Sequence, residues 1–191
     1  YPYDIEHEQL GFHVTDDLTV GMIQETPWPA GNTLYEGCNV TLTGIVTADT
    51  AQYNSVYSAY ALQNESGQWN GMIFDTDAIV QISRGDDVSV IGLVTEYAHG
   101  DEFGYQLDGN TRLIHSDVTV NSSGNDTPAP VVASCEDLAQ TAEEVESYEG
   151  VLVKLENVTV SSVNAYDWSI TDGTGSEALI DDDMANMAAD N

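Results

Sequence analysis

Basic residues are almost absent from this sequence. Lys and Arg together number 3, against 33 Asp and Glu in 191 residues, which gives a formal net charge of −30 at pH 7. Proteins that bind nucleic acid neutralise phosphates with Lys and Arg, and those that bind single strands need a positively charged groove. Because a chain of this charge repels polyanions, we expect no nucleic-acid partner.

Long apolar runs and catalytic signatures are also missing. No stretch approaches the roughly 20 apolar residues that a membrane-spanning helix requires, so we expect no membrane insertion. The histidines are scattered, and there is no nucleophile elbow and no Cys/His metal spacing. We therefore expect no catalytic residues, no enzymatic activity and no cofactor, with calcium as the one candidate ligand.

Cysteine is scarce, with only Cys38 and Cys135. The chain begins at Tyr1 without Met and retains no targeting segment, so we expect a processed protein that is secreted to the extracellular surface. In such an oxidising compartment we expect one disulfide between Cys38 and Cys135. Two buried free thiols are the alternative.

Asn-x-Ser/Thr sequons, in contrast, are frequent. Such sequons are acceptors for N-linked glycans in exported proteins. The sequence therefore predicts a glycoprotein with five candidate sites: Asn39, Asn64, Asn121, Asn125 and Asn157.

An internal repeat organises the chain. The tripeptide Tyr-Glu-Gly occurs at 35–37 and at 148–150, and each copy opens a segment with apolar residues at alternate positions. This period is typical of half-buried β-strands. The match continues in two further pairs of segments: 60–67 with 168–175, and 71–75 with 177–181. The sequence therefore predicts two copies of one β-unit.

The first copy has enough strands to close a barrel. It continues through a Gly-Asp turn at 84–87 into an alternating strand over 88–97, and a further strand near 105–107 or 113–120 completes the set. Five strands, with Gly44 where the first must bend, indicate an OB-type barrel. The second copy has only three such strands, which suit either an incomplete OB-like barrel or an Ig-like sandwich.

We therefore expect an all-β protein with two barrel or sandwich domains joined by a linker and a short helix. The polar stretch that ends at Pro128 and Pro130 indicates the linker, and apolar residues near helical spacing predict the helix over 135–147. The predicted organisation is an N-terminal strand segment at 1–19, an OB-like β-domain at 20–121, the linker and helix at 122–147, and a second, incomplete β-domain at 148–191.

The second copy needs a partner strand. Three strands leave unpaired backbone groups along both edges, and each buried unpaired group costs about 1 to 3 kcal/mol. The N-terminal segment offers an assembly strand whose apolar residues are mostly spaced by two: Tyr1, Tyr3, Ile5, Leu10, Phe12 and Val14. This strand can pair within its own chain or insert into a neighbouring molecule, and the second option predicts a homopolymer.

A tight turn and three adjacent acids near the C-terminal end form the best candidate for a cation site. Carboxylate oxygens are the ligands that Ca²⁺ prefers, although the spacing lacks the EF-hand pattern. The candidate calcium ligands are Asp172, Asp181, Asp182 and Asp183. The alternative is a turn without a metal.

The turns and strands resemble the tandem OB-like β-modules of secreted bacterial proteins, which accompany extracellular nucleases, lamin-tail domains or sorting domains. The motifs that carry the resemblance are at 35–48, 64–72, 85–88, 148–160 and 168–182. They are structural turns and core strands, so the resemblance implies a noncatalytic module and transfers no catalytic residue. No nuclease domain follows in this sequence.

Two functions are open from the sequence. The first is a noncatalytic structural protein that assembles into an extracellular, pilus-like filament or surface layer by donating its N-terminal strand to the next subunit. The second is a monomeric extracellular module, accessory to a secreted hydrolase, that binds carbohydrate or a partner enzyme. Its binding platform would be aromatic: Tyr53, Tyr57, Tyr60, Trp69, Tyr97, Phe103 and Tyr105.

Overall fold

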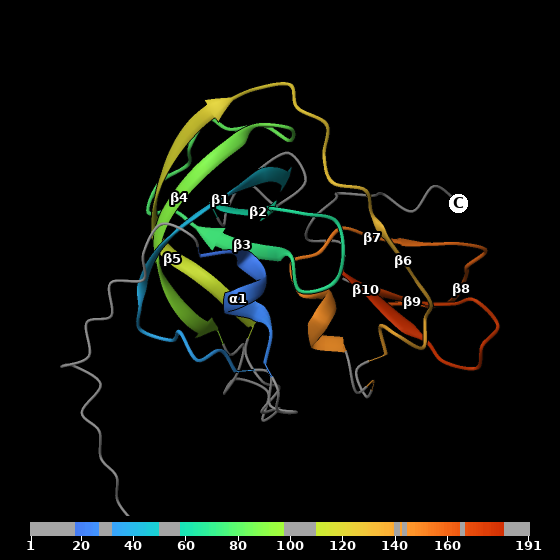
Figure 1. Cartoon of the computed structure of the whole chain (residues 1–191). Coiled ribbons are helices and arrows are strands. Elements are labelled where there is room, and N and C mark those ends of the chain that lie inside the picture. Colours follow the sequence, from blue (N-terminus) through green and yellow to red (C-terminus); the bar gives the residue numbers. More distant parts are fainter. Residues whose placement is uncertain are drawn as a thin grey trace, which may run out of the picture.

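The fold is known from a computed structural model, shown in Figure 1. It describes residues 18–26, 32–49, 58–97, 110–139, 142, 145–164 and 167–181. Within these ranges the chain is built mainly of strands, with two short helical segments, so the predicted all-β class is confirmed. The strands form a barrel and a smaller β-part beside it (Figure 1).

The barrel comprises β1 (Asn39–Ala48), β2 (Ala59–Gln63), β3 (Gly71–Asp75), β4 (Asp87–Tyr97) and β5 (Asn110–Ser122). It is closed, with the order β1-β2-β3-β5-β4. Adjacent strands are antiparallel except β3 and β5, which run parallel. A closed barrel of five strands is what the sequence predicts for the first unit.

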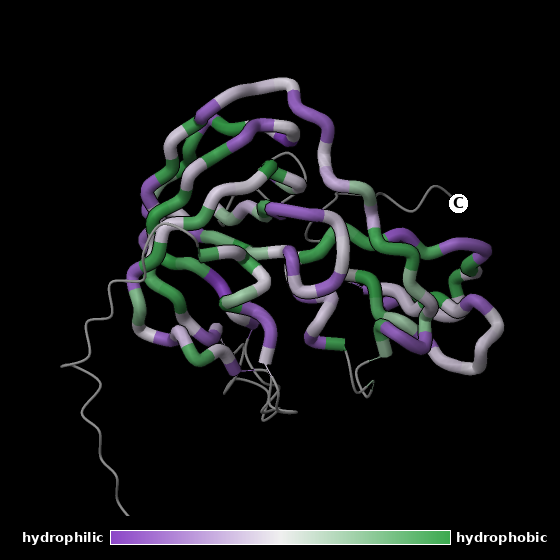
Figure 2. Tube along the Cα trace, in the orientation of Figure 1, coloured by the Kyte–Doolittle hydropathy of each residue, from purple (hydrophilic) through white to green (hydrophobic). Residues whose placement is uncertain are grey.

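Period-two alternation builds the barrel core. Val40 and Leu42 of β1 point inward and are buried, whereas Thr41 and Thr43 between and beyond them are exposed. Hydrophobic and hydrophilic residues alternate in a similar way along the first part of β4 (Figure 2). This pattern buries one face of β1 and of β4, whereas all five residues of β2 are buried.

Two aromatic rings occupy the centre of the barrel. Tyr60 of β2 and Phe74 of β3 are fully buried and stack with their ring centroids 5.2 Å apart. The Tyr60 hydroxyl donates a hydrogen bond to the Val80 carbonyl at 3.1 Å and accepts one from the Val80 N–H at 2.8 Å. The buried hydroxyl is therefore satisfied, and it fixes the chain that follows β3.

A short helix, α1 (Val20–Gln24), packs beside β3 (Figure 1). Thr19 caps it, because its Oγ1 accepts a hydrogen bond from the Met22 N–H at 3.2 Å. Val20 and Ile23 are buried in the barrel core. The helix therefore adds an apolar face to the core.

The smaller β-part contains two sheets. β6 (Val131–Ala133) pairs in parallel with β7 (Val153–Leu155), and β8 (Thr159–Val163), β9 (Asp167–Thr171) and β10 (Ala178–Asp181) form an antiparallel sheet in the order β10-β9-β8. A 3-10 helix, η2 (Val145–Tyr148), precedes β7. The buried core of this part is small: Cys135, Ile170 and Ala178, with Leu138, Leu155, Trp168 and Ile180 packed against it.

The repeat found in the sequence is visible in these elements. Both Tyr-Glu-Gly tripeptides form turns that end in a glycine of positive φ, 79° at Gly37 and 63° at Gly150. The β2–β3 hairpin corresponds to the β9–β10 hairpin. The long strand β1 corresponds to β7 and β8 together, and the interruption between them includes Asn157, whose φ is 57°.

The predicted helix over 135–147 is wrong for the described residues of that range. Residues 135–139 form turns and a bend, and only the short 3-10 helix η2 follows. The Ser134 N–H donates to Asp137 Oδ2 at 2.8 Å, and the Asp137 N–H donates to Ser134 Oγ at 3.2 Å. These local bonds offer the backbone an alternative to a helix.

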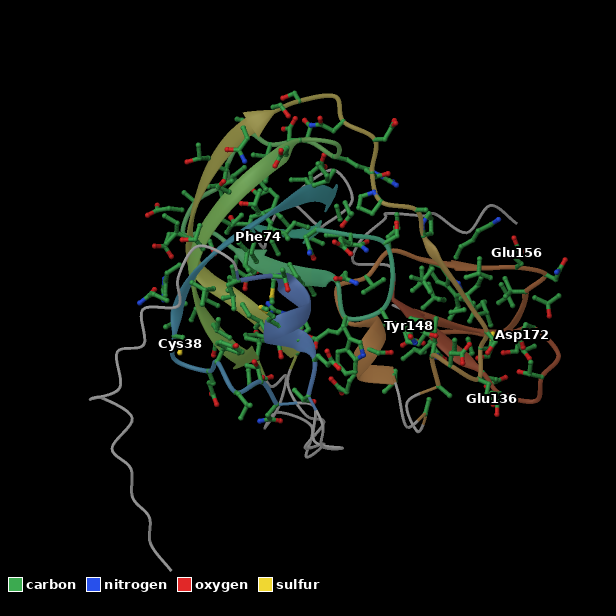
Figure 3. The ribbon with its side chains drawn as sticks, viewed as in Figure 1. Cys38, Phe74, Glu136, Tyr148, Glu156 and Asp172 are labelled. Atoms are coloured by element: carbon green, nitrogen blue, oxygen red, sulfur yellow. The ribbon has the colours of Figure 1, made fainter. Side chains whose placement is uncertain are left out.

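The predicted disulfide between Cys38 and Cys135 is also wrong, because both thiols are free. Cys38 packs against the barrel core, on the side away from the smaller β-part (Figure 3). Cys135 is buried in the core of the smaller part. The two cysteines thus belong to separate cores, an arrangement that their positions in the sequence do not reveal.

The last residue of β2 and the turn that follows it hold the two parts together. Gln63 Oε1 accepts a hydrogen bond from the Leu152 N–H at 2.7 Å, and the Trp69 N–H donates to the Ser147 carbonyl at 2.7 Å. Tyr148, next to Ser147, lies between the barrel and the smaller part (Figure 3). These bonds join segments that are far apart in the sequence.

Two glycines allow the backbones to touch at this junction. A Cβ on Gly150 would lie 2.8 Å from the Gly71 carbonyl carbon, and a Cβ on Gly71 would overlap the Gly150 backbone. Real Cβ atoms do not approach backbone this closely, so the contact requires glycine on both sides. The Tyr-Glu-Gly repeat therefore supplies a junction residue in its second copy.

We expect Gly71→Ala to separate the two parts or to destabilise them by about 1 to 3 kcal/mol, because an added methyl has no space in the packed junction. Gly21→Ala is the matched control, since a Cβ there lies 3.5 Å or more from its neighbours and alanine suits a helix. Urea unfolding followed by tryptophan fluorescence measures both. Equal unfolding midpoints for the two variants would contradict the crowding.

Candidate functional site

The β8-β9-β10 sheet has an apolar face that is only partly covered. Ile170 and Ala178 are 5% and 1% exposed on this face. Val160 lies opposite Ile170 in the antiparallel register, and Val163 lies opposite Trp168, so both valines point to the same face. Nevertheless Val160 is 57% exposed and Val163 is 66% exposed. The apolar face therefore extends beyond the small core.

The residues that pack against this apolar face do not extend over β8. They are Cys135, Leu138 and Leu155, which pack against Ile170 and Ala178. All five residues of β8 are exposed. Figure 1 places β8 on the side of the smaller part that faces away from the barrel. The exposed valines are therefore not buried by the first unit.

The outer edge of β8 also differs from its counterpart in the barrel. Counted from the Tyr-Glu-Gly turns, Thr159 corresponds to Val46 of β1. Val46 donates a hydrogen bond to the Asp86 carbonyl at 2.8 Å and accepts one from the Gly85 N–H at 2.9 Å. Among the described residues, β8 pairs only with β9. Its outer backbone groups form an exposed edge, which together with Val160 and Val163 we call the open β8 surface.

Asp172, a predicted calcium ligand, holds a turn against the chain that follows β6. Its Oδ2 accepts a hydrogen bond from the Cys135 N–H at 2.8 Å, and its Oδ1 accepts bonds from the N–H and hydroxyl of Thr174 at 3.1 and 2.7 Å. These bonds stabilise the carboxylate and lower the pKa of Asp172 to about 2. Asp172 is therefore charged at neutral pH and already serves the fold.

The side chains of the other three predicted calcium ligands lie outside the part of the chain that the structure describes. Asp181 ends β10, but its side chain lies outside the description, as do Asp182 and Asp183. In the part of the chain that the structure describes, no three His, Cys, Asp or Glu side chains are grouped so as to hold a metal ion. Calcium binding stays a prediction.

A carboxyl group that sequence reasoning missed lies at the junction. Burial, together with the nearby charges of Glu146 and Glu96, raises the pKa of Glu149 to about 9, against smaller opposing effects of the Thr111 N–H and Arg112. Glu149 Oε1 is buried without a hydrogen-bond partner among the described residues. This side chain is therefore protonated and neutral at pH 7.

Arg112 does not neutralise Glu149, because it is engaged elsewhere. Its Nη1 lies 2.9 Å from Asp75 Oδ2, and its guanidinium lies over the Tyr97 ring, 4.1 Å from the centroid. Glu96 Oε1 accepts hydrogen bonds from the Thr33 N–H at 2.6 Å and the Thr111 hydroxyl at 2.9 Å. The junction thus contains more carboxyl groups than bases.

The histidines and aromatic residues form no common site in the described ranges. His115 Nδ1 lies 2.7 Å from Asp77 Oδ1, and both side chains are more than two-thirds exposed. Tyr60 is in the core, Trp69 is half-buried at the junction and Tyr97 is 42% exposed beneath Arg112. The residues that lie outside the described ranges are His7, His13, His99, Tyr53, Tyr57, Phe103 and Tyr105.

The predicted assembly strand also lies outside the described residues: Tyr1, Tyr3, Ile5, Leu10, Phe12 and Val14. The five sequon asparagines are all described. No helix in the described ranges has the length and apolar character that crossing a membrane requires.

Comparison with known proteins gives no relative. No protein-family model, no curated protein and no solved structure matches this chain. The functional argument therefore depends on the geometry of the open β8 surface and on the distribution of charge.

The pKa of Glu149 predicts how stability depends on pH. The folded protein keeps this proton up to a pKa of about 9, whereas the unfolded chain releases it near 4.5, so folding takes up a proton between these values. Stability should therefore fall as pH rises from about 5 to about 9. Glu149→Gln, which is neutral and of the same shape, should remove this contribution and be the more stable protein at the alkaline end.

Urea unfolding across this pH range, on wild type and variant, measures the effect. Other acids also contribute to the pH dependence, so the difference between the two proteins isolates Glu149. Glu36→Gln is the matched control, because Glu36 occupies the same position of the repeat and is exposed. Parallel curves for wild type and Glu149→Gln would show that Glu149 is not protonated in the fold.

Proposed function

We propose that this protein is a noncatalytic structural protein, exported from the cell, that assembles into an extracellular filament or surface layer. In this proposal the N-terminal strand of one copy adds to the open β8 surface of the next. The observation that carries it is the exposure of Val160 and Val163 on the face that buries Ile170. An exposed strand edge beside an apolar face is suited to strand addition.

The N-terminal sequence fits the role of the added strand. Leu10, Phe12 and Val14 alternate over five residues, and β8 is also five residues long. A strand paired along the outer edge of β8 places alternate side chains on one face, where they would cover Val160 and Val163. Backbone hydrogen bonds then supply the affinity and the apolar contacts supply the register.

Charge supports the choice of these two segments. Each copy carries a net charge of −30, so two copies repel one another strongly. Residues 157–164, which include β8, contain no charged side chain, and residues 10–14 contain no acid. Two copies can therefore meet here without placing carboxylates opposite one another. Repulsion between the rest of the molecules is reduced by salt or by divalent cations such as calcium.

We infer that the barrel itself is an OB-like module with a scaffolding role. Its order β1-β2-β3-β5-β4 supports an OB-like fold. Binding of nucleic acid in such a barrel requires several bases, but this chain has only 3 Lys and Arg, and Arg112 is paired with Asp75. The barrel instead supports the smaller part through the junction at Gly71 and Gly150.

The double variant Val160→Thr/Val163→Thr tests the open β8 surface. Threonine keeps the shape and the strand preference of valine but replaces an apolar methyl with a hydroxyl, so assembly should be lost while the fold is kept. Leu179→Thr is the matched control, because Leu179 is 51% exposed on the opposite face of the same sheet. Electron microscopy and size-exclusion chromatography at increasing salt and calcium measure assembly. Filaments of the double variant equal to those of wild type would refute the role of this surface.

Deletion of residues 1–14 tests the donor strand separately. The shortened protein should remain a monomer, and a peptide of residues 1–14 should bind to it with one peptide per chain. Assembly that survives the deletion would exclude N-terminal strand donation.

A wild-type protein that stays monomeric under all of these conditions would contradict assembly itself. The alternative is then a monomeric binding module accessory to a secreted hydrolase. Titration of that monomer with polysaccharides tests it, with Trp69 fluorescence as the signal and substitution of Trp69 and Tyr97 as the control.

A further inference from the structure

We propose that Asn39 and Asn157 are the N-glycosylation sites of this protein and that Asn64, Asn121 and Asn125 have structural roles. The inference rests on the export that belongs to the proposed function, but it does not depend on assembly. The five sequons are equivalent in the sequence, and only the surroundings of each side chain distinguish them.

Asn121 uses its side-chain amide to join β4 and β5. Its Nδ2 donates hydrogen bonds to Asp87 Oδ1 at 3.2 Å and to Ser89 Oγ at 3.1 Å. A primary amide has two N–H hydrogens, so both are engaged. A glycan would replace one of them and would place a sugar where two neighbouring strands pair.

Asn125, which follows β5, uses its side-chain amide in the same way to bind the turn before β4. Its Nδ2 donates to the Gly85 carbonyl at 3.0 Å and to Ser122 Oγ at 3.1 Å, and its backbone N–H donates to the same carbonyl at 2.9 Å. A Cβ on Gly85 would lie 2.8 Å from the Asn125 carbonyl oxygen, so the two segments are in close contact. Both hydrogens of this amide are therefore engaged, and a glycan would replace one of these bonds.

Asn64 lies at the end of β2, in the turn that forms the junction. Its side chain is half-buried, and its Oδ1 is buried without a hydrogen-bond partner among the described residues. The neighbouring Gln63 accepts the hydrogen bond from Leu152 that joins the two parts. A glycan on this half-buried side chain would place a sugar against the turn that joins the two parts.

Asn39 and Asn157 are exposed, and within the described residues neither side chain takes part in a hydrogen bond. Asn39 is the first residue of β1, and Asn157 lies in the turn between β7 and β8 with a φ of 57°, a conformation that asparagine tolerates better than most residues. The hydroxyl residues of both sequons, Thr41 and Thr159, are exposed as well. Both sequons are therefore accessible in the folded chain.

The two sites lie at opposite ends of the molecule. Asn39 follows Cys38, which is on the far side of the barrel, and Asn157 follows Glu156, which is at the far end of the smaller part (Figure 3). Glycans here would add bulk and hydration to both ends without touching the junction. Only Val158 separates Asn157 from β8, so its glycan would lie at the end of the open edge.

The reaction requires a glycosyl donor activated as a diphosphate, such as a lipid-linked diphospho-oligosaccharide. Nδ2 of the asparagine forms a bond to the anomeric carbon, the bond from that carbon to the diphosphate oxygen breaks, and Nδ2 releases one proton. The lipid diphosphate leaves with the electron pair of the broken bond. No oxidant or reductant takes part, and the amide must have a hydrogen that is free to leave.

Expression of the full chain behind an export signal, in a host that N-glycosylates exported proteins, tests the inference. Glycopeptide mass spectrometry should find glycans on Asn39 and Asn157 and none on the other three asparagines. Thr41→Val and Thr159→Val remove one sequon each while they keep the asparagine, so each variant should lose one glycan and the double variant should carry none.

A glycan on Asn64, Asn121 or Asn125 would overturn the inference, and so would an empty Asn39 or Asn157. Thermal unfolding of the non-glycosylated protein provides a second measurement. Asn121→Asp and Asn125→Asp should lower the unfolding midpoint, because each loses donors, whereas Asn39→Asp and Asn157→Asp should leave it unchanged. Assembly is measured on non-glycosylated protein, so a failure of the proposed function and a failure of this inference give different results.

Discussion

The backbone contact between Gly71 and Gly150 is the constraint on which the rest of the structure depends. It brings the second Tyr-Glu-Gly turn against β3, and it positions the hydrogen bonds of Gln63 with Leu152 and of Trp69 with Ser147. Among the described residues the buried cluster of the smaller part has only three members, so packing against the barrel contributes to its stability. The barrel in turn is closed, so its five strands pair with one another.

This structural difference between the two copies explains why the open β8 surface is in the smaller part. Once the junction is made, the smaller part is held at its inner side, and its core covers β9 and β10 but ends before β8. In the barrel, β1 pairs with β4. Val46, the counterpart of Thr159 in β8, is hydrogen-bonded through its backbone to Gly85 and Asp86 in the turn before β4. The second copy repeats the strands but, as far as the described residues show, not the pairing of this outer edge, so the edge of β8 is exposed.

The parts of the fold that the sequence predicts are those set by local alternation. Alternate spacing alone predicts which residues point into the barrel: Val40, Leu42, Val88 and Val90. The repeat also predicts the position of the second hairpin correctly. What depends on contacts between distant segments is not visible in this way. Glu36 and Glu149 occupy the same position of the repeat, yet one is exposed and the other is at the junction, and the two cysteines belong to separate cores. The five sequons likewise differ only through their neighbours in space.

The shortage of bases determines how this chain accommodates its acids. With 33 carboxylates and 3 Lys and Arg, ion pairs satisfy few of them, and other means are needed. Asp172 keeps its charge by accepting hydrogen bonds from Cys135 and Thr174, whereas Glu149 loses its charge by retaining a proton in the buried junction. Asp49 and Asp86 are also buried, and they accept hydrogen bonds from the Arg84 and Ser83 N–H groups. Exposed acids are screened by cations. An uncharged stretch is therefore where another acidic surface meets least repulsion, and β8 lies within such a stretch, beside apolar side chains that burial would stabilise.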